Sequence, residues 1–159
     1  MTLPASFLTR PIAHRALHDR KAGRMENSVK SIKAAIDAGY GIEIDVQLTC
    51  DGHAMVFHDD RLDRLTGETG PVRARTRAEL EAIALTDDCG TIPSLEKVLE
   101  MVAGQVPLLI EIKDQDGAMG PQVGPLEAAT CAALKDYAGD VALMSFNPHA
   151  VAVCAELAP

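Results

Sequence analysis

The sequence predicts an α/β protein in which helices cover a parallel β-sheet. Stretches with strand character alternate with stretches of helical periodicity along its 159 residues. The strand candidates are apolar on both faces, which is typical of strands buried under helices. Charged side chains gather where these strands end, and ligands of parallel sheets bind at the carboxyl ends of the strands. We therefore expect a functional site at one rim of the sheet.

The first strand and the first helix follow from the residues at their ends. PIAHR (11–15) is a short apolar stretch that runs into charge, as a strand entering a site does. The helix that follows can be capped by Asn27 and ended by Gly39. Its apolar residues fall on one face at helical spacing: Val29, Ile32 and Ile36.

A hairpin is predicted directly after the second strand. The strand GIEIDVQLT is followed by an Asp-Gly pair, a strong signal for a two-residue hairpin turn, and then by HAMVFH. Such a turn places Cys50 opposite His53 and, stepping outward, Asp45 opposite His58. Strictly parallel strands need a longer crossover, so we expect a local hairpin that extends from the rim of the sheet.

The second half of the chain continues the alternation. A loop punctuated by glycine and proline occupies 62–74, and Thr76 with Glu79 forms a capping box for a short helix. Ser94 can cap another helix, whose apolar residues lie at helical spacing: Leu95, Val98, Leu99 and Val102. The remaining elements are a strand in 106–114, a helix from about Pro125 to Tyr137, a strand in 141–147 and a last helix that begins at Asn147-Pro148.

The composition argues against several classes of protein. Fifteen basic residues against 23 acidic ones give a net charge of −8, which disfavours a nucleic-acid partner. The 47% of hydrophobic residues suffices for the core of one domain. No apolar run approaches the ~18 residues of a membrane span, and the N-terminus lacks the apolar core of a signal peptide. We therefore expect a cytoplasmic protein whose four widely spaced cysteines are reduced.

The strand IEIDV contains two carboxylates that need an explanation. Glu43 and Asp45 are two residues apart, so both side chains point to the same face of the strand. Neighbouring carboxylates repel each other unless a cation neutralises them, and oxygen ligands favour Mg²⁺ or Ca²⁺ over zinc. The alternative is a pair of exposed carboxylates on an edge strand. The flanking isoleucines and valine indicate a central strand and favour the metal.

Six segments carry a resemblance to a known family. In chain order they are AHR (13–15), EN (26–27), EIDVQLTCDG (43–52), VFHDDRLDRLTGETG (56–70), IPSLEKVL (92–99) and LLIEIK (108–113). Each is weak alone, but the ordered series resembles the successive motifs of the glycerophosphodiester phosphodiesterase family. That family splits glycerophosphodiesters into glycerol 3-phosphate and an alcohol such as choline or ethanolamine.

The resemblance implies a fold and a set of site residues. The fold is a (β/α)₈ TIM-type barrel with a small insertion after the third strand, similar to 61–92 here. Its implied roles are metal binding by Glu43, Asp45 and Glu111, acid–base catalysis by His14 and His58, and phosphate binding by Arg15 and Lys113. Glu26, Asn27 and Phe146 are candidates for the pocket wall. Glu26-Asn27 serves equally well as a helix start, and packing is the stronger alternative for Phe146.

Two features depart from the family pattern. Ala16 stands where the family has glycine, and alanine strains the loop there if the position needs a positive φ. Only about the first five of eight β/α units are present, so residues 1–159 form a single incomplete barrel domain with open edges. The chain is then part of a longer enzyme, or it self-associates through the open barrel edge.

A non-catalytic association module and an enzyme for other phosphodiesters remain alternatives. The alcohol released, the metal and the direct or cyclic course of the reaction stay open.

Overall fold

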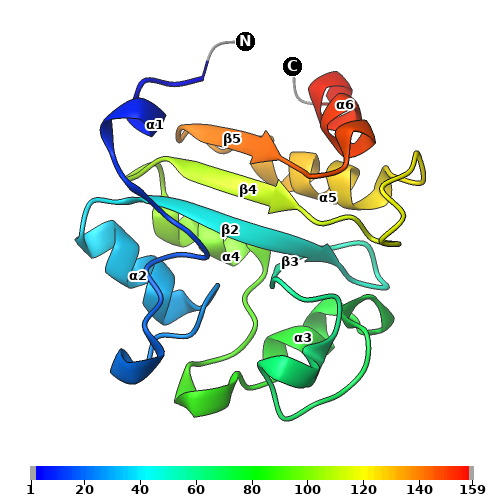
Figure 1. The fold of residues 1–159 in the computed structure, drawn as a ribbon, viewed down its shortest axis with the longest axis horizontal. Coiled ribbons are helices and arrows are strands. Elements are labelled where there is room, and N and C mark those ends of the chain that lie inside the picture. The colour runs from blue at the N-terminus through cyan, green and yellow to red at the C-terminus, as the bar shows by residue number, and fades with distance from the viewer. Residues whose placement is uncertain (1–2, 158–159) are drawn as a thin grey trace.

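The computed structural model describes residues 3–157 as a β-sheet with helices packed against it (Figure 1). Four strands run parallel in the order β1-β2-β4-β5, with these bounds: Ile12–Ala13, Gly41–Leu48, Leu108–Ile112 and Val141–Met144. The fifth strand, β3 (Ala54–Val56), pairs antiparallel with β2. The five predicted strands and the parallel sheet are thus confirmed, and the local hairpin accounts for the one antiparallel strand.

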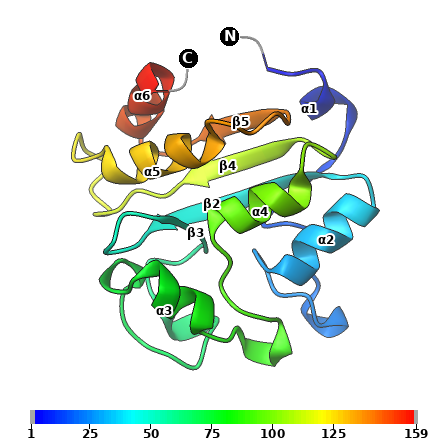
Figure 2. The ribbon, with the colours of Figure 1, turned by 180° about the vertical axis from the view of Figure 1, so that it is seen from behind.

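Three helices cover one face of this sheet. α2 (Val29–Asp37), α4 (Leu95–Val102) and α5 (Pro125–Leu134) lie on the same side, as Figure 2 shows. The shorter α1 (Ser6–Thr9) and α3 (Arg77–Ala82), with α6 (Pro148–Leu157), lie around the margins. None of the helices between residues 3 and 157 combines the length and the apolar character needed to cross a membrane.

The alternation along β2 and β4 separates an apolar face from a polar one. The side chains that pack on the helices are buried in one hydrophobic core: Ile42, Ile44, Val46, Leu108, Ile110 and Ile112. The intervening residues point away from these helices, because successive side chains of a strand alternate between faces. Asp45 pairs with Glu111 in the parallel register, and Glu43 pairs with Leu109. The register therefore places the acidic side chains of two strands next to each other.

The hairpin after β2 has a different register from the one predicted. Thr49 pairs with His53 through an N–H to oxygen bond of 2.9 Å, which leaves a three-residue loop with Gly52 at φ +83°. The expected pairing of Cys50 with His53 was therefore wrong by one residue. Phe57 rather than His58 lies opposite Asp45, and its N–H donates to the Asp45 carbonyl. One extra loop residue shifts every cross-strand partner by one.

The helix ends confirm most of the cap predictions. Thr76 and Glu79 form the expected capping box, Gly39 follows α2 at φ +71°, and the Asn147 side chain accepts from the His149 N–H at the start of α6. Asn27 does not cap α2, because Ser28 fills that position. The Ser94 hydroxyl makes no cap bond and instead accepts from Arg77. Helix α5 ends at Leu134 and not at Tyr137.

Residues 61–92 pack around a small core of their own. Two 3₁₀ turns (Leu62–Arg64 and Val72–Ala74) and α3 enclose apolar side chains that also contact Met55 and Phe57 of the hairpin. This second core packs the segment against the hairpin, and Figure 1 shows the segment beside β3. All four cysteines are free thiols.

Candidate functional site

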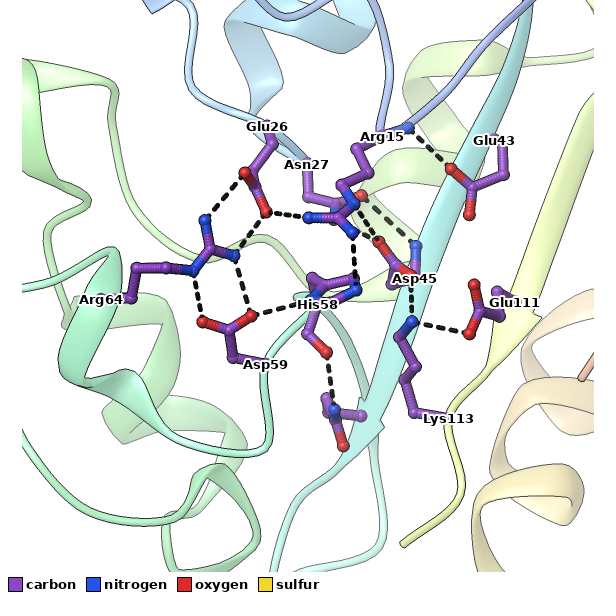
Figure 3. Close-up of polar contacts among 11 residues, drawn as sticks. Arg15, Glu26, Asn27, Glu43, Asp45, His58, Asp59, Arg64, Glu111 and Lys113 are labelled. Carbon is purple, nitrogen blue, oxygen red and sulfur yellow. Dashed lines mark hydrogen bonds and ion pairs between the residues drawn. The ribbon is translucent and has the colours of Figure 1, made fainter. Parts of the chain in front are cut away.

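Three carboxylates converge on the polar face of the sheet. Glu43 and Asp45 come from β2 and Glu111 from β4, and one oxygen of each lies within 4.8 Å of the others (Figure 3). Their exposed fractions are only 5%, 0% and 6%. We call these three residues the carboxylate cluster. The edge-strand alternative fails, because β2 lies between β1 and β4 and its carboxylates are buried.

The cluster holds more negative charge than its surroundings compensate. Burial raises the pKa of Glu43 to about 7, and the charges of Asp45 and Glu111 add to this, although the Arg15 N–H donates to Glu43 Oε2 at 2.6 Å. Glu43 Oε1 is buried and has no hydrogen-bond partner within residues 3–157. The Asn27 amide donates to Asp45 Oδ2 at 2.8 Å. One oxygen of the cluster thus remains open to a cation.

Lys113 supplies the one ammonium group in contact with the cluster in the described part of the chain. Its Nζ lies 2.6 Å from Glu111 Oε1 and 2.8 Å from Asp45 Oδ1. Glu111 and Lys113 are two residues apart, the spacing of an ordinary same-face ion pair. The structure shows that pair, and it adds Asp45 from the neighbouring strand.

The loop after β1 brings Arg15 to the same rim. Arg15 and Ala16 have φ of +55° and +63°, and the Ala16 N–H donates to the Glu43 carbonyl at 2.9 Å. The position of Ala16 therefore needs the left-handed conformation that glycine adopts without cost. Alanine there costs roughly 1–2 kcal/mol of backbone strain.

Arg15 belongs to a closed ring of five charged or polar side chains (Figure 3). Arg15 Nη1 contacts Glu26 at 3.0 Å, and Glu26 accepts two bonds from Arg64, at 2.7 and 3.0 Å. Arg64 also donates two bonds to Asp59, at 2.7 and 2.8 Å. Asp59 Oδ1 contacts His58 Nδ1 at 2.7 Å, and His58 Nε2 returns to Arg15 Nη2 at 2.8 Å. We call these five residues the ion-pair ring.

The ion-pair ring stabilises the charged forms of its members. Hydrogen bonds from Arg64 lower the pKa of Asp59 to about 2, against the opposing effect of burial. Burial acts to raise the pKa of Glu26, but the hydrogen bonds and charges of Arg64 and Arg15 outweigh it and keep that pKa below its ordinary value. The two carboxylates raise the pKa of Arg64 in turn.

A cavity of about 480 Å³ opens beside the carboxylate cluster and the ring. His14 lines it from the end of β1 and makes no side-chain hydrogen bond to other residues in 3–157. Phe146, 73% exposed, lines it from the end of β5. The complete lining is Ile12, His14, Arg15, Glu43, His58, Leu109, Glu111, Lys113, Met144 and Phe146. Six of the seven residues expected to bind metal or phosphate or to act as acid and base therefore share one cavity, and the seventh, Asp45, lies behind it.

Sequence reasoning missed three contributions to this site. Asp59 and Arg64 belong to the motif VFHDDRLDRLTGETG but received no role, because charged residues of a loop usually contact solvent. Asn27, expected on the pocket wall, is buried and makes two hydrogen bonds with Asp45: its side-chain amide donates to Asp45 Oδ2, and its Oδ1 accepts from the Asp45 N–H. Its φ of +56° is a local signal that only the structure reveals.

Comparison with known proteins agrees with this geometry. A model of the glycerophosphoryl diester phosphodiesterase family matches residues 14–159. A glycerophosphodiester phosphodiesterase from Caldanaerobacter subterraneus subsp. tengcongensis is 33% identical over 143 residues, which cover 84% of this chain and 58% of that protein.

Solved structures share the sheet and its helices. A phosphodiesterase from Oleispira antarctica, in complex with the product sn-glycerol-3-phosphate, superimposes with a TM-score of 0.82 at 28% identity, over 97% of this chain and 65% of that one. A glycerophosphodiester phosphodiesterase from Agrobacterium tumefaciens gives a TM-score of 0.78 at 26% identity, over 94% and 63%. The chain thus spans only about three fifths of these relatives. With nearly all of its residues matched by the family model, it belongs to the glycerophosphoryl diester phosphodiesterase family.

Proposed function

We propose that this chain supplies the catalytic rim of a metal-dependent hydrolase that splits glycerophosphodiesters into glycerol 3-phosphate and an alcohol. The observation that supports this most directly is the convergence of the carboxylate cluster, two cationic side chains and two histidines on one cavity of about 480 Å³. The product bound by the Oleispira antarctica relative supports the same substrate class. The predicted cytoplasmic location stays a prediction.

The carboxylate cluster fits a divalent cation. Its donors are all carboxylate oxygens, which suit Mg²⁺ or Ca²⁺, and Glu43 Oε1 is buried with no hydrogen-bond partner in residues 3–157. Glu43, Asp45 and Glu111 would hold the ion. When bound, such an ion withdraws charge from a phosphoryl oxygen and so favours nucleophilic attack at phosphorus.

Arg15 and Lys113 would neutralise the phosphodiester from the protein side. Arg15 lines the cavity with its guanidinium, whose planar set of donors matches phosphate oxygens in pairs. Lys113 lines the same cavity as a point charge. Neutralising the anion matters because its own charge repels nucleophiles, and fixed positive groups stabilise the charge that grows in the transition state.

His14 and His58 would move the protons. Both line the cavity, and an imidazole titrates close enough to neutral pH to accept a proton from the nucleophile or to donate one to the leaving oxygen. Phe146 would present its exposed ring to the carbon atoms of the substrate.

A second candidate is an association module without catalysis. The observation that favours it is the open sheet: within residues 3–157, β1 and β5 each have one hydrogen-bonded neighbouring strand and so form its two edges. Unpaired edges promote pairing with another chain, including a second copy. Turnover separates this candidate from the first, because self-association of an active enzyme would be accompanied by hydrolysis and that of a non-catalytic module would not.

The test is release of glycerol 3-phosphate from glycerophosphocholine by the 159-residue chain, with Mg²⁺, with Ca²⁺ and with a chelator. We expect turnover only with a divalent cation, and a fall of about 10²-fold or more in His14→Ala and His58→Ala. His149→Ala on α6 is the matched control and keeps wild-type turnover.

Analytical ultracentrifugation of the same samples reports self-association. Full turnover in both histidine variants would refute the acid–base assignment, and a dimer without turnover would favour the association module.

A further inference from the structure

The hydrogen bonds of His58 determine where its proton lies. A guanidinium has only donors, so Arg15 Nη2 at 2.8 Å requires His58 Nε2 to accept. The proton of the neutral imidazole then lies on Nδ1, which donates to Asp59 Oδ1 at 2.7 Å. In this arrangement the Nε2 lone pair is directed at Arg15, and both side chains line the cavity.

Asp59 can hold this tautomer only if its carboxylate is itself held. Both of its oxygens accept from Arg64, at 2.7 and 2.8 Å, so the plane of the carboxylate is fixed by a two-point contact. No other side chain within residues 3–157 forms an ion pair with Asp59 apart from His58. The orientation of Asp59 therefore depends on Arg64.

Arg64 also fixes the orientation of Arg15. It donates two bonds to Glu26, and Glu26 accepts from Arg15 Nη1 at 3.0 Å. Arg64 thus holds, through one carboxylate each, both the imidazole and the guanidinium that meet at the cavity. It does not line the cavity itself, and its side chain comes from the 3₁₀ turn at Leu62–Arg64, outside the sheet.

We propose that Arg64 is a positioning residue that sets the tautomer of His58 through Asp59 and the direction of Arg15 through Glu26. The consequence for catalysis rests on the proposed function: Nε2, which accepts from Arg15 in this structure, is the nitrogen of His58 that would take a proton once Arg15 turns to the substrate phosphate, which leaves the acid role to His14. The arrangement of protons within the ion-pair ring does not depend on that function. The proposal also assigns a role to residues 61–92, because this segment contributes Arg64, which links Glu26 to Asp59 in the ion-pair ring.

The chain offers a matched control on the same turn. Arg61 directly precedes the 3₁₀ turn and forms an ion pair with Asp63 at 3.3 Å, with no contact to the ion-pair ring. Arg64→Met and Arg61→Met both remove one guanidinium from an exposed surface. Only the first removes the two-point contacts to Asp59 and Glu26, so a general loss of charge and a loss of positioning give different results.

The experiment is ¹⁵N NMR of the imidazole rings, with the His58 signals identified by their loss in His58→Gln. Spectra are recorded without metal at a pH at which the ring is neutral. We expect wild type and Arg61→Met to show the Nδ1–H form, and Arg64→Met to shift toward Nε2–H or a mixture. Arg64→Gln is the second variant should Arg64→Met not fold. An unchanged His58 tautomer in the Arg64 variants, or an Nε2–H form in wild type, would overturn the proposal.

Turnover provides the second readout. We expect Arg64→Met to lower kcat about 10- to 100-fold, the size typical of residues that orient groups at a site, with Arg61→Met at the wild-type value. If neither wild type nor any variant hydrolyses the substrate, the proposed activity of this chain is refuted. The NMR result still decides the role of Arg64. If wild type and Arg64→Met turn over equally, the positioning role is refuted and the activity stands.

Discussion

The carboxylate cluster and the ion-pair ring lie side by side at one rim of the sheet, yet they treat charge in opposite ways (Figure 3). The cluster gathers three carboxylates around one ammonium, and burial raises the pKa of Glu43 to about 7. The ring sets two carboxylates against two guanidinium groups, and the pKa of Asp59 falls to about 2. The carboxylate cluster thus disfavours the charged form of Glu43, whereas the ion-pair ring balances its charges and favours the charged form of Asp59.

This difference indicates which region binds and which region supports. A buried negative excess is costly until a cation enters, so the cluster is suited to a divalent ion. The charges of the ion-pair ring already balance, so an added ion would gain little there. The contacts of the ring are suited instead to fixing the orientation of its side chains. Arg15 and His58 belong to the ring but face the cavity, and the two regions meet at these residues.

The largest expected effect comes from removing the ammonium group that contacts the cluster. In Lys113→Met the three carboxylates lose the ammonium that lies 2.6 and 2.8 Å from two of them. We expect the free energy of unfolding in chelator to fall by about 3–5 kcal/mol, as for other broken buried pairs, and to recover with Mg²⁺ or Ca²⁺. Urea unfolding with and without the ion measures this, with exposed Lys97→Met as control. An equal loss in both conditions would mean that no cation replaces the ammonium.

The next effect concerns the affinity for the metal. Asp45→Asn preserves the shape of the residue and removes one charge from the cluster. We expect the affinity for the divalent ion to fall about 100-fold, or about 2.7 kcal/mol, since ligand charge sets the affinity of oxygen sites. Titration calorimetry measures it, and Glu100→Gln on the exposed face of α4 is the control. Unchanged binding in Asp45→Asn would place the ion elsewhere or exclude it.

A smaller effect on the affinity for the metal is expected from Asn27, which contacts Asp45 and not the ion. The Asn27 side chain makes two hydrogen bonds with Asp45 and its backbone has φ +56°, so Asn27→Ala removes both bonds and adds backbone strain. Asn27→Gly removes the bonds without that strain, because glycine adopts this φ freely. We expect the affinity for the ion to fall about 10- to 100-fold in both variants, and stability to fall further in the alanine variant. Wild-type affinity in Asn27→Gly would show that the amide does not orient Asp45.

The sequence allowed the carboxylate cluster to be predicted in full. Spacing of two residues put Glu43 and Asp45 on one face, and the resemblance added Glu111 from the strand that pairs with β2. The strands and most helix ends were also predictable, because caps such as Thr76 with Glu79 act locally. Local rules of this kind depend on residues a few positions apart.

The ion-pair ring could not be predicted, because its contacts depend on tertiary structure. Arg64 reaches Glu26 across 38 residues of chain, and only the fold of the 3₁₀ turn at Leu62–Arg64 brings them together. The hairpin register failed for a different reason. An Asp-Gly pair fits both a two-residue and a three-residue loop, and Thr49 with His53 closes the longer one.

The smallest expected effect is a pH dependence of the free energy of unfolding that comes from the ion-pair ring. Hydrogen bonds from Arg64 lower the pKa of Asp59 from 3.8 to about 2, so folding favours its charged form. This stabilisation is present above pH 3.8 and is lost as the pH falls toward 2, on the order of 1–2 kcal/mol. Urea unfolding between pH 5 and pH 2.5 measures the loss in wild type and Arg61→Met. In Arg64→Met the slope should flatten, because Asp59 keeps only its contact with His58 and Glu26 only its contact with Arg15, so both gain less from ionising. An unchanged slope would mean that the ring adds no stability and that its role is confined to orienting His58 and Arg15.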